Sequence, residues 1–249
     1  MNQFIVFGDS ITFGDELADV SYEKRKSDPS KYAWPALLNA ENYSQAGLSN
    51  FGIRRFCINF STFHRPDYVI VAWSYNDRTE FLQAENKTGF EDTKERDKLF
   101  TTIGPNWKAA YDRQKDIKKQ GKQFVDLYYK YFYNDFSGIY NTLSNIYFTQ
   151  LHLESLNLNY SMTFPSYRSL CVDDEYIFNL FVDNPAIDAV IGSIEQLYKL
   201  IDWTKFIFMQ NTFSDYGGIM DLATEHMPHG HPTQECHNKY ADELRRRIF

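Results

Sequence analysis

A serine near the start of the chain stands where a nucleophile would be placed. Ser10 lies in the segment GDSITFG at 8–14, directly after the apolar run QFIVFG at 3–8. A sharp turn at the end of a strand exposes a serine hydroxyl, and backbone N–H groups of such a turn point to where an oxyanion would form. The pattern therefore indicates nucleophilic attack on an acyl group. The more common elbow, Gly-x-Ser-x-Gly, does not occur in the chain.

Three later segments stand at the boundaries of predicted elements. They are QAGLSN with Gly47, SYND with Asn76, and HPT with His231. The first two stand at the ends of predicted strands, and the third precedes the last predicted helix.

In chain order, the four segments resemble the conserved blocks of the SGNH hydrolases, also called GDSL-type hydrolases, from residue 3 to residue 241. The resemblance implies a serine esterase in which Ser10 is the nucleophile and His231 is the general base. It implies an oxyanion hole made by the N–H groups of Ser10 and Gly47 and by the side-chain amide of Asn76. It also implies that no metal and no organic cofactor takes part.

The chain departs from the family pattern at two places. The third block normally begins with glycine, and here Ser74 stands in its place; a serine fits if its φ is negative. The family also places an aspartate two or three residues before the histidine, where this chain has His229 and Pro228. Because that aspartate holds the imidazole in the correct tautomer, replacing it by an amide can cost about 10⁴ in turnover.

Several explanations of the missing aspartate stay open at this point. A backbone carbonyl orients His231, or another carboxylate does so, or the enzyme is slow or lapsed. The candidate carboxylates are Asp215, Asp221 and Glu225. Neutral His229 could accept a hydrogen bond, but it cannot supply the negative charge that stabilises an imidazolium.

Two charged residues, Asp9 within the first block and Arg78 directly after the third, are candidate substrate-binding residues. An arginine fork suits a carboxylate or phosphate. The competing interpretation, which we prefer, is a local ion pair between Arg78 and Glu80 and a structural hydrogen bond for Asp9. The stretch Trp73–Phe81, with the Tyr/Phe-rich region that follows, is similar to uncharacterised SGNH-like proteins encoded by bacteriophages.

The blocks follow predicted strands and precede predicted helices. The predicted strands are 3–8, 42–46 and 67–73, and the predicted helices are 29–40, with Pro35 in its first turn, and the helix capped by Ser49. This alternation predicts a three-layer α/β/α sandwich with a parallel sheet, and the resemblance implies the flavodoxin-like SGNH form of it. Ligands bind at the carboxyl ends of such strands, so the loops after the three strands are expected on one rim.

The remainder is expected to complete a single SGNH-hydrolase-like domain, residues 1–249, with a helical, aromatic-rich insertion at about 78–157. The later predicted elements are a helix at 122–157, a strand at 158–164, and helices at 185–201 and 233–248. Aromatic residues make up 17% of the chain and crowd the first of these helices. We expect most of them to pack the insertion onto the core and some to line a cleft over Ser10.

The overall composition excludes several classes of protein. The 249 residues include 33 acidic and 26 basic ones, which gives no electrostatic footprint for nucleic acid. No apolar stretch approaches the roughly 18 residues that a membrane span needs. The first residues lack the features of a secretory signal, and the three cysteines lack paired spacing. These features predict a cytoplasmic protein, or a virion component if a bacteriophage encodes it; the oligomeric state stays open.

Four histidines late in the chain, His226, His229, His231 and His237, raise the question of a metal. They lack the i, i+4 helical pair of a common zinc site, and no carboxylate partner is evident. We therefore predict no metal site, and we expect His237 to be a surface or packing residue on the last helix.

These observations predict a serine esterase for small acyl esters, with O-acetyl groups on carbohydrate ahead of lipid esters. Two alternatives stay open. One is a catalytically lapsed SGNH-fold protein that binds carbohydrate. The other is an O-acyltransferase that uses the same Ser10 and His231 with a hydroxyl acceptor in place of water.

Overall fold

The computed structural model describes residues 3–20, 28–82, 100–105, 119–172, 175–177, 179, 189–209, 217–222 and 225–248. Within these ranges, no helix is both long and apolar enough to cross a bilayer. Cys57, Cys171 and Cys236, all within the described ranges, are buried and are not joined by disulfides.

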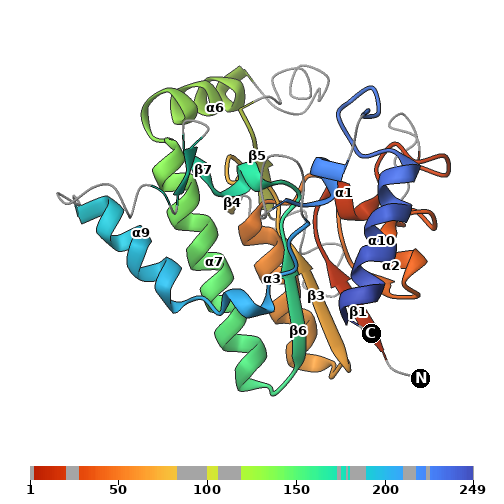
Figure 1. Ribbon diagram of the computed structural model, residues 1–249. Helices are drawn as coiled ribbons and strands as arrows, with labels where there is room; N and C mark the ends of the chain where they lie inside the picture. The colour runs from red at the N-terminus through yellow and green to blue at the C-terminus, as the bar shows by residue number, and fades with distance from the viewer. Residues whose placement is uncertain are drawn as a thin grey trace.

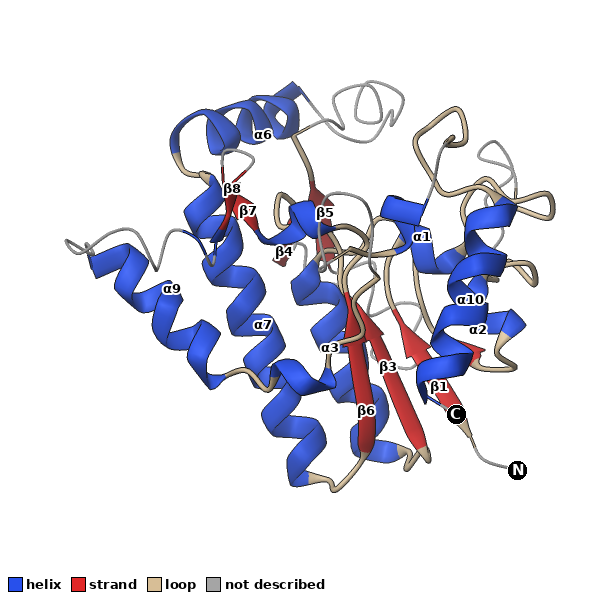
Figure 2. Ribbon diagram, viewed as in Figure 1, coloured by secondary structure: helices blue, strands red, loops and turns tan. Residues whose placement is uncertain are grey.

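A four-stranded parallel sheet forms the middle of the protein (Figures 1 and 2). Its strand order is β2 (Glu41–Asn42), β1 (Phe4–Phe7), β3 (Tyr68–Ala72) and β6 (Asn159–Thr163). The pairing of β1 with β3 runs from Phe4 opposite Tyr68 to Phe7 opposite Val71. Helices cover both faces of these strands, which explains why β1 and β3 read as continuous apolar runs and not as alternating ones.

Three helices cover one face of the sheet (Figure 1). They are α3 (Asn50–Phe63), α7 (Asp135–Ser155) and α9 (Ala189–Leu200). The middle helix, α7, contacts both α3 and α9. Its side chains Ile139, Leu143 and Ile146 are completely buried in one apolar cluster with the sheet. The predicted cap of α3 is confirmed, because Ser49 Oγ accepts a hydrogen bond from the Gly52 N–H at 3.1 Å.

The opposite face is covered by α10 (Gln234–Ile248) and the short α2 (Trp34–Leu37) (Figure 1). Tyr240 of α10 and Trp34 of α2 meet edge to face, with ring centroids 5.5 Å apart, in the cluster that also holds Val6 of β1. The α10 helix begins as predicted after Thr233, whose Oγ1 accepts from the Cys236 N–H at 3.4 Å. The predicted three-layer α/β/α arrangement with a parallel sheet is thus confirmed.

The other described elements are short, apart from α6. They are α1 (Ser10–Phe13), the hairpin of β4 (Thr79–Leu82) and β5 (Phe100–Ile103), α6 (Lys119–Tyr131), the pair β7 (Cys171–Val172) and β8 (Glu175–Tyr176), and 3₁₀ turns at Tyr167–Leu170, Trp203–Lys205 and Ile219–Leu222. Figure 2 shows α1 and α6 at the end of the molecule where the strands finish.

The predicted helix at 122–157 is two helices with a break between them. Asn134 causes the break, because it caps α7: its side chain accepts from the Ser137 N–H at 2.8 Å, and Ser137 Oγ accepts from the Asn134 N–H at 3.1 Å. Although α7 lies within the predicted insertion at 78–157, it packs against the sheet. It therefore belongs to the helical layer that covers the sheet.

Two other predicted elements are shorter than expected. The helix predicted at 29–40 is only α2, which has Pro35 in its first turn and ends before Asn39, a residue at φ 56°. The strand predicted at 42–46 is the two-residue β2, because Asn42 Oδ1 accepts from the Ser44 N–H at 3.0 Å and turns the chain. The strand at 158–164 and the helix at 185–201 are confirmed as β6 and α9, although 185–188 lies outside the described residues.

Candidate active site

The predicted nucleophile begins a short helix at the carboxyl end of β1. Asp9 is the N-cap of α1, and its Oδ1 accepts from the Ile11 N–H at 3.0 Å. Gly14 ends the helix at φ 80°, a conformation that favours glycine. Ser10 is therefore the first residue of a capped turn, and it is buried. The strand–turn–helix setting predicted for a nucleophilic serine is present.

Gly47, the predicted backbone donor, lies in the loop after β2. Its φ is 87°, so any other residue would be strained there. Two residues earlier, the Gln45 N–H donates to the Gly8 carbonyl at 3.1 Å. This hydrogen bond joins the second block to the first at the carboxyl edge of the sheet.

Asn76, the predicted side-chain donor, lies in the turn after β3. Two helices hold the backbone of this turn. A Cβ added to Gly138 of α7 would lie 2.8 Å from the Asn76 carbonyl oxygen, which is too close for any other residue. The backbone of α7 therefore packs directly against the turn. From α6, the Tyr129 hydroxyl donates to the Asp77 carbonyl at 2.7 Å. The position of the turn thus depends on both helices.

Ser74, which replaces the family glycine, is held by a residue for which the sequence suggested no role. The Asn50 side chain accepts from the Ser74 N–H at 2.7 Å and donates to the Ser74 carbonyl at 3.3 Å and to Thr142 Oγ1 at 3.0 Å. Ser74 has no positive φ, so a serine is accommodated. Asn50 directly follows the helix cap, and nothing local in the sequence indicates contacts with residues so distant in the chain.

Asp9 and Arg78 form an ion pair with 2.7 Å between Oδ2 and Nη1. The same Asp9 oxygen accepts from the Ser74 hydroxyl at 2.7 Å, and Arg78 also donates to the Leu48 carbonyl at 3.2 Å. The Asp9 side chain is only 1% exposed. These contacts join the first three blocks, and the structural role expected for Asp9 is confirmed. Substrate binding by either residue stays a prediction.

The prediction of an ion pair between Arg78 and Glu80 is wrong. Glu80 instead pairs with Arg55 of α3 at 2.7 Å and accepts from Ser49 Oγ at 3.0 Å. Arg78 precedes β4 and points to the buried carboxylate of Asp9, while Glu80 within β4 faces α3. The sheet and α3 bring oppositely charged partners from elsewhere in the chain to both residues.

His231, the predicted base, ends a tight turn. The Gly230 N–H donates to the Met227 carbonyl, and the Met227 N–H donates to the His231 carbonyl, both at 2.8 Å. Gly230 has φ 87°. Pro228 and His229 occupy the two central positions of this turn, which proline suits at the first. The positions where the family has its aspartate are thus turn positions here.

A carboxylate does contact His231, and it comes from the loop after the nucleophile. Glu16 Oε2 lies 2.8 Å from His231 Nδ1. The backbone N–H of His229 donates to both oxygens of Glu16, at 3.2 and 3.3 Å. The Glu16 side chain is 6% exposed, and its backbone has φ 69°. This contact joins the last block to the first, across 215 residues of sequence.

Two of the carboxylates proposed from the sequence, Asp221 and Glu225, are not this partner. Asp221 accepts hydrogen bonds from Ser166 Oγ at 3.0 Å and from the N–H groups of Tyr167 and Gly218 at 3.1 and 2.7 Å. Glu225 is exposed. Asp215 lies outside the described residues. Sequence reasoning missed Glu16 because the three proposed carboxylates all lie close to the histidine in the chain, and Glu16 does not.

His237, expected as a surface or packing residue, is completely buried on α10. Its Nδ1 accepts from the Trp34 N–H at 3.2 Å, and within the described part of the chain its Nε2 has no hydrogen-bond partner. Burial, and secondarily the charge of nearby His231, lowers the pKa of His237 to about 4. His237 is therefore neutral at pH 7. No group of three or more His, Cys, Asp or Glu side chains in the described ranges could hold a metal ion.

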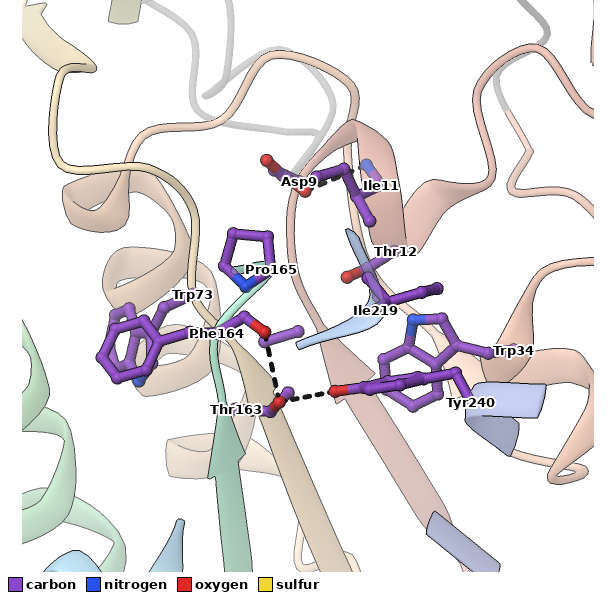
Figure 3. A pocket seen from close by; sticks show the side chains of 11 residues that line it. Asp9, Ile11, Thr12, Trp34, Trp73, Thr163, Phe164, Pro165, Ile219 and Tyr240 are labelled. Atoms are coloured by element: carbon purple, nitrogen blue, oxygen red, sulfur yellow. Dashed lines mark hydrogen bonds between the residues drawn. The ribbon is translucent and has the colours of Figure 1, made fainter. Parts of the chain in front are cut away.

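A small cavity lies beneath α1, between the sheet and α10 (Figure 3). Its free volume is about 10 Å³, room for about one water molecule. Among its lining residues, Thr163 and Tyr240 are hydrogen-bonded to each other through their hydroxyls, and Thr163 also contacts the Ile207 carbonyl at 3.1 Å. Ligand pockets are typically about 300 Å³ or larger, so this cavity, which Asp9 and Ile11 help to line, is a packing feature and not a substrate site.

No protein-family model and no curated protein sequence matches this chain. Among solved structures, the chain is similar to the psychrotrophic esterase EstA from a Pseudoalteromonas species, in a structure inhibited by monoethylphosphonate. The identity is 11%, the match covers 100% of this chain and 97% of that one, and the TM-score is 0.48. A G-D-S-L family protein from Desulfitobacterium hafniense DCB-2 is similar at 10% identity, with 99% of each chain covered and a TM-score of 0.40.

Proposed function

We propose that this protein is a serine esterase that hydrolyses small acyl esters, most readily O-acetyl groups on carbohydrate. Ser10 Oγ attacks the ester carbonyl while His231 Nε2 takes the serine proton. The resulting oxyanion is held by the N–H groups of Ser10 and Gly47 and by the Asn76 amide. The proton then passes to the leaving alcohol, and a water molecule activated by His231 releases the acid from the acyl-serine.

The observation that carries this proposal is the set of hydrogen bonds and ion pairs that join the four blocks to one another. Asp9, next to the nucleophile, binds Ser74 of the third block and Arg78 directly after that block, at 2.7 Å each. The same arginine reaches the Leu48 carbonyl in the second block, and the turn of His231 contacts the loop that follows α1. Catalytic groups from distant parts of a chain need such rigid placement, because small displacements reduce rates strongly.

A carbohydrate ester is favoured by the aromatic surface of α6. The Tyr129 hydroxyl of this helix fastens the residue after Asn76. The same helix and its end expose Phe124, Tyr131 and Phe132, with Phe132 73% exposed. Aromatic rings with an exposed face can pack against apolar faces of a sugar ring, and a ring beside an oxyanion donor can influence substrate choice.

The proposal is tested with p-nitrophenyl acetate and acetylated glycans as substrates. We expect the wild-type protein to release acetate and Ser10→Ala to lose essentially all of this activity. The matched control is Ser193→Ala, because Ser193 is an exposed serine on α9 and its replacement should leave the rate unchanged. Equal rates for wild type and Ser10→Ala would refute the esterase mechanism.

Two further measurements distinguish the alternatives. A fluorophosphonate probe should label Ser10 covalently in the wild type and not in Ser10→Ala; a protein that only binds carbohydrate would not be labelled. Product analysis in the presence of acceptor sugars separates hydrolysis from transfer. We expect free acetate to exceed transferred acetyl, whereas an O-acyltransferase would give the opposite ratio.

A further inference from the structure

We infer that Glu16 is the positioning carboxylate of the active site and replaces the aspartate that is missing before His231. This inference rests on the proposed function, in which His231 is the general base. It makes the site a complete Ser10–His231–Glu16 triad, with the acid supplied by the loop that follows the nucleophile.

The contact determines which imidazole nitrogen can act as the base. An ionised carboxylate has no proton to donate, so the 2.8 Å contact with Glu16 Oε2 requires His231 Nδ1 to carry the hydrogen. In neutral imidazole the other nitrogen, Nε2, then has the free lone pair that a general base needs. The negative charge of Glu16 also stabilises the imidazolium formed when Nε2 takes the serine proton.

The surroundings of Glu16 are those of a fixed acceptor. Its side chain is 6% exposed, and the backbone N–H of His229 donates to both of its oxygens. Its ionisable neighbours in the described part of the chain include His231 and also His229, whose Nε2 lies 3.9 Å from Oε1. Both imidazoles can only add positive charge beside the carboxylate.

The backbone of Glu16 indicates the same role. A non-glycine residue at φ 69° is uncommon, because the side chain is strained in this left-handed conformation. Such conformations persist where the surrounding structure requires them, often at active sites. Here the strained residue follows the glycine at φ 80° that ends α1, so a short turn directs the carboxylate toward His231.

The loop that carries Glu16 is fastened to the helix that follows His231. The Ser30 N–H donates to the Phe13 carbonyl at 2.9 Å, which ties residues 30–34 to the end of α1. From the other side, the Trp34 N–H donates to His237, and Gln234 Nε2 donates to the Tyr32 carbonyl at 2.9 Å. Besides the contacts of His229, the acid and the base are therefore joined by a second set of contacts that does not involve residues 228 and 229.

The inference is tested with Glu16→Gln, which preserves size and removes the charge. We expect kcat/KM for p-nitrophenyl acetate to fall about 10³- to 10⁴-fold, as when a triad carboxylate becomes an amide. The matched control is Glu225→Gln, the same change at an exposed glutamate that precedes the turn of His231, and it should stay within twofold of wild type. A loss of less than about threefold in Glu16→Gln would overturn the inference.

A second measurement does not depend on activity. ¹⁵N NMR of the histidine-labelled wild-type protein, with His231 assigned by its loss in His231→Gln, reports which ring nitrogen is protonated. We expect a protonated Nδ1 and an unprotonated Nε2 in neutral His231; the opposite tautomer would overturn the role of Glu16. If wild type and Ser10→Ala are equally inactive, the esterase proposal fails, and the tautomer alone decides the inference about Glu16.

Discussion

Acid conditions should destabilise the protein through one buried histidine. His237 is completely buried and neutral, its Nδ1 accepts from the Trp34 N–H, and burial lowers its pKa to about 4. An unfolded histidine has a pKa of about 6.5. The folded state therefore binds this proton more weakly than the unfolded state. The stabilisation is fully present above pH 6.5 and is lost progressively as the pH falls toward 4.

The size of the effect is set by the two pKa values. A difference of about 2.5 pH units, at about 1.36 kcal/mol for each unit, sets an upper limit of roughly 3 kcal/mol. Linkage gives a loss of about 2 kcal/mol at pH 5 relative to pH 7 and about 3 kcal/mol at pH 4. This is a large share of the roughly 5–15 kcal/mol by which folded domains are stable.

The assay is urea unfolding of wild type and His237→Asn at pH 7, 6 and 5. Asparagine Oδ1 can replace Nδ1 as the acceptor for Trp34, and asparagine does not titrate in this range. The smaller side chain lowers the free energy of unfolding at every pH. Because asparagine does not titrate, the further loss between pH 7 and pH 5 should be about 2 kcal/mol smaller in His237→Asn than in wild type. The matched control is the same change at exposed His64, which should leave the slope as in wild type. Parallel curves for wild type and His237→Asn would refute the reasoning.

Two other substitutions test the contacts and the backbone conformation that position the blocks. Asp9→Asn should lower the free energy of unfolding by about 3 kcal/mol, because the amide can still cap α1 but leaves the Arg78 guanidinium without its buried counter-charge; a loss below about 1 kcal/mol in urea unfolding would contradict this. Gly47→Ala should cost about 1–2 kcal/mol, because alanine is strained at φ 87°, and it should also slow p-nitrophenyl acetate hydrolysis by displacing an oxyanion donor. An unchanged melting temperature and rate for Gly47→Ala would show that this backbone position is not constrained.

Much of the fold could be predicted from local signals. The apolar runs that became β1 and β3, the cap at Ser49 and the helix predicted at 233–248 are all confirmed, because each reflects burial or hydrogen bonding within a few residues. Predictions failed where a polar side chain redirects the chain. Asn134 divides a predicted helix in two, and Asn42 shortens a predicted strand. Asparagine makes local hydrogen bonds that compete with regular structure, and hydrophobic periodicity does not register them.

In the candidate site, too, some residues could be predicted from local sequence and others could not. Ser10, Gly47, Asn76 and His231 could be proposed from the sequence, because each lies in a short motif at the end of a predicted element and parallel strands bring their carboxyl ends to one edge. The same reasoning could not find the partners of these residues. Arg78 was expected to pair with a near neighbour, and the structure pairs it with Asp9.

By itself, the sequence determined which residue types could do the chemistry and which elements carry them. Helix capping, glycine conformation and strand burial each depend on only a few neighbouring residues. Only the tertiary structure decided which carboxylate meets the histidine. Glu16 and His231 are separated by 215 residues, and no periodicity or spacing links them. Their contact exists because α1, residues 30–34 and α10 pack together, and a pairing between distant side chains is a property of that packing.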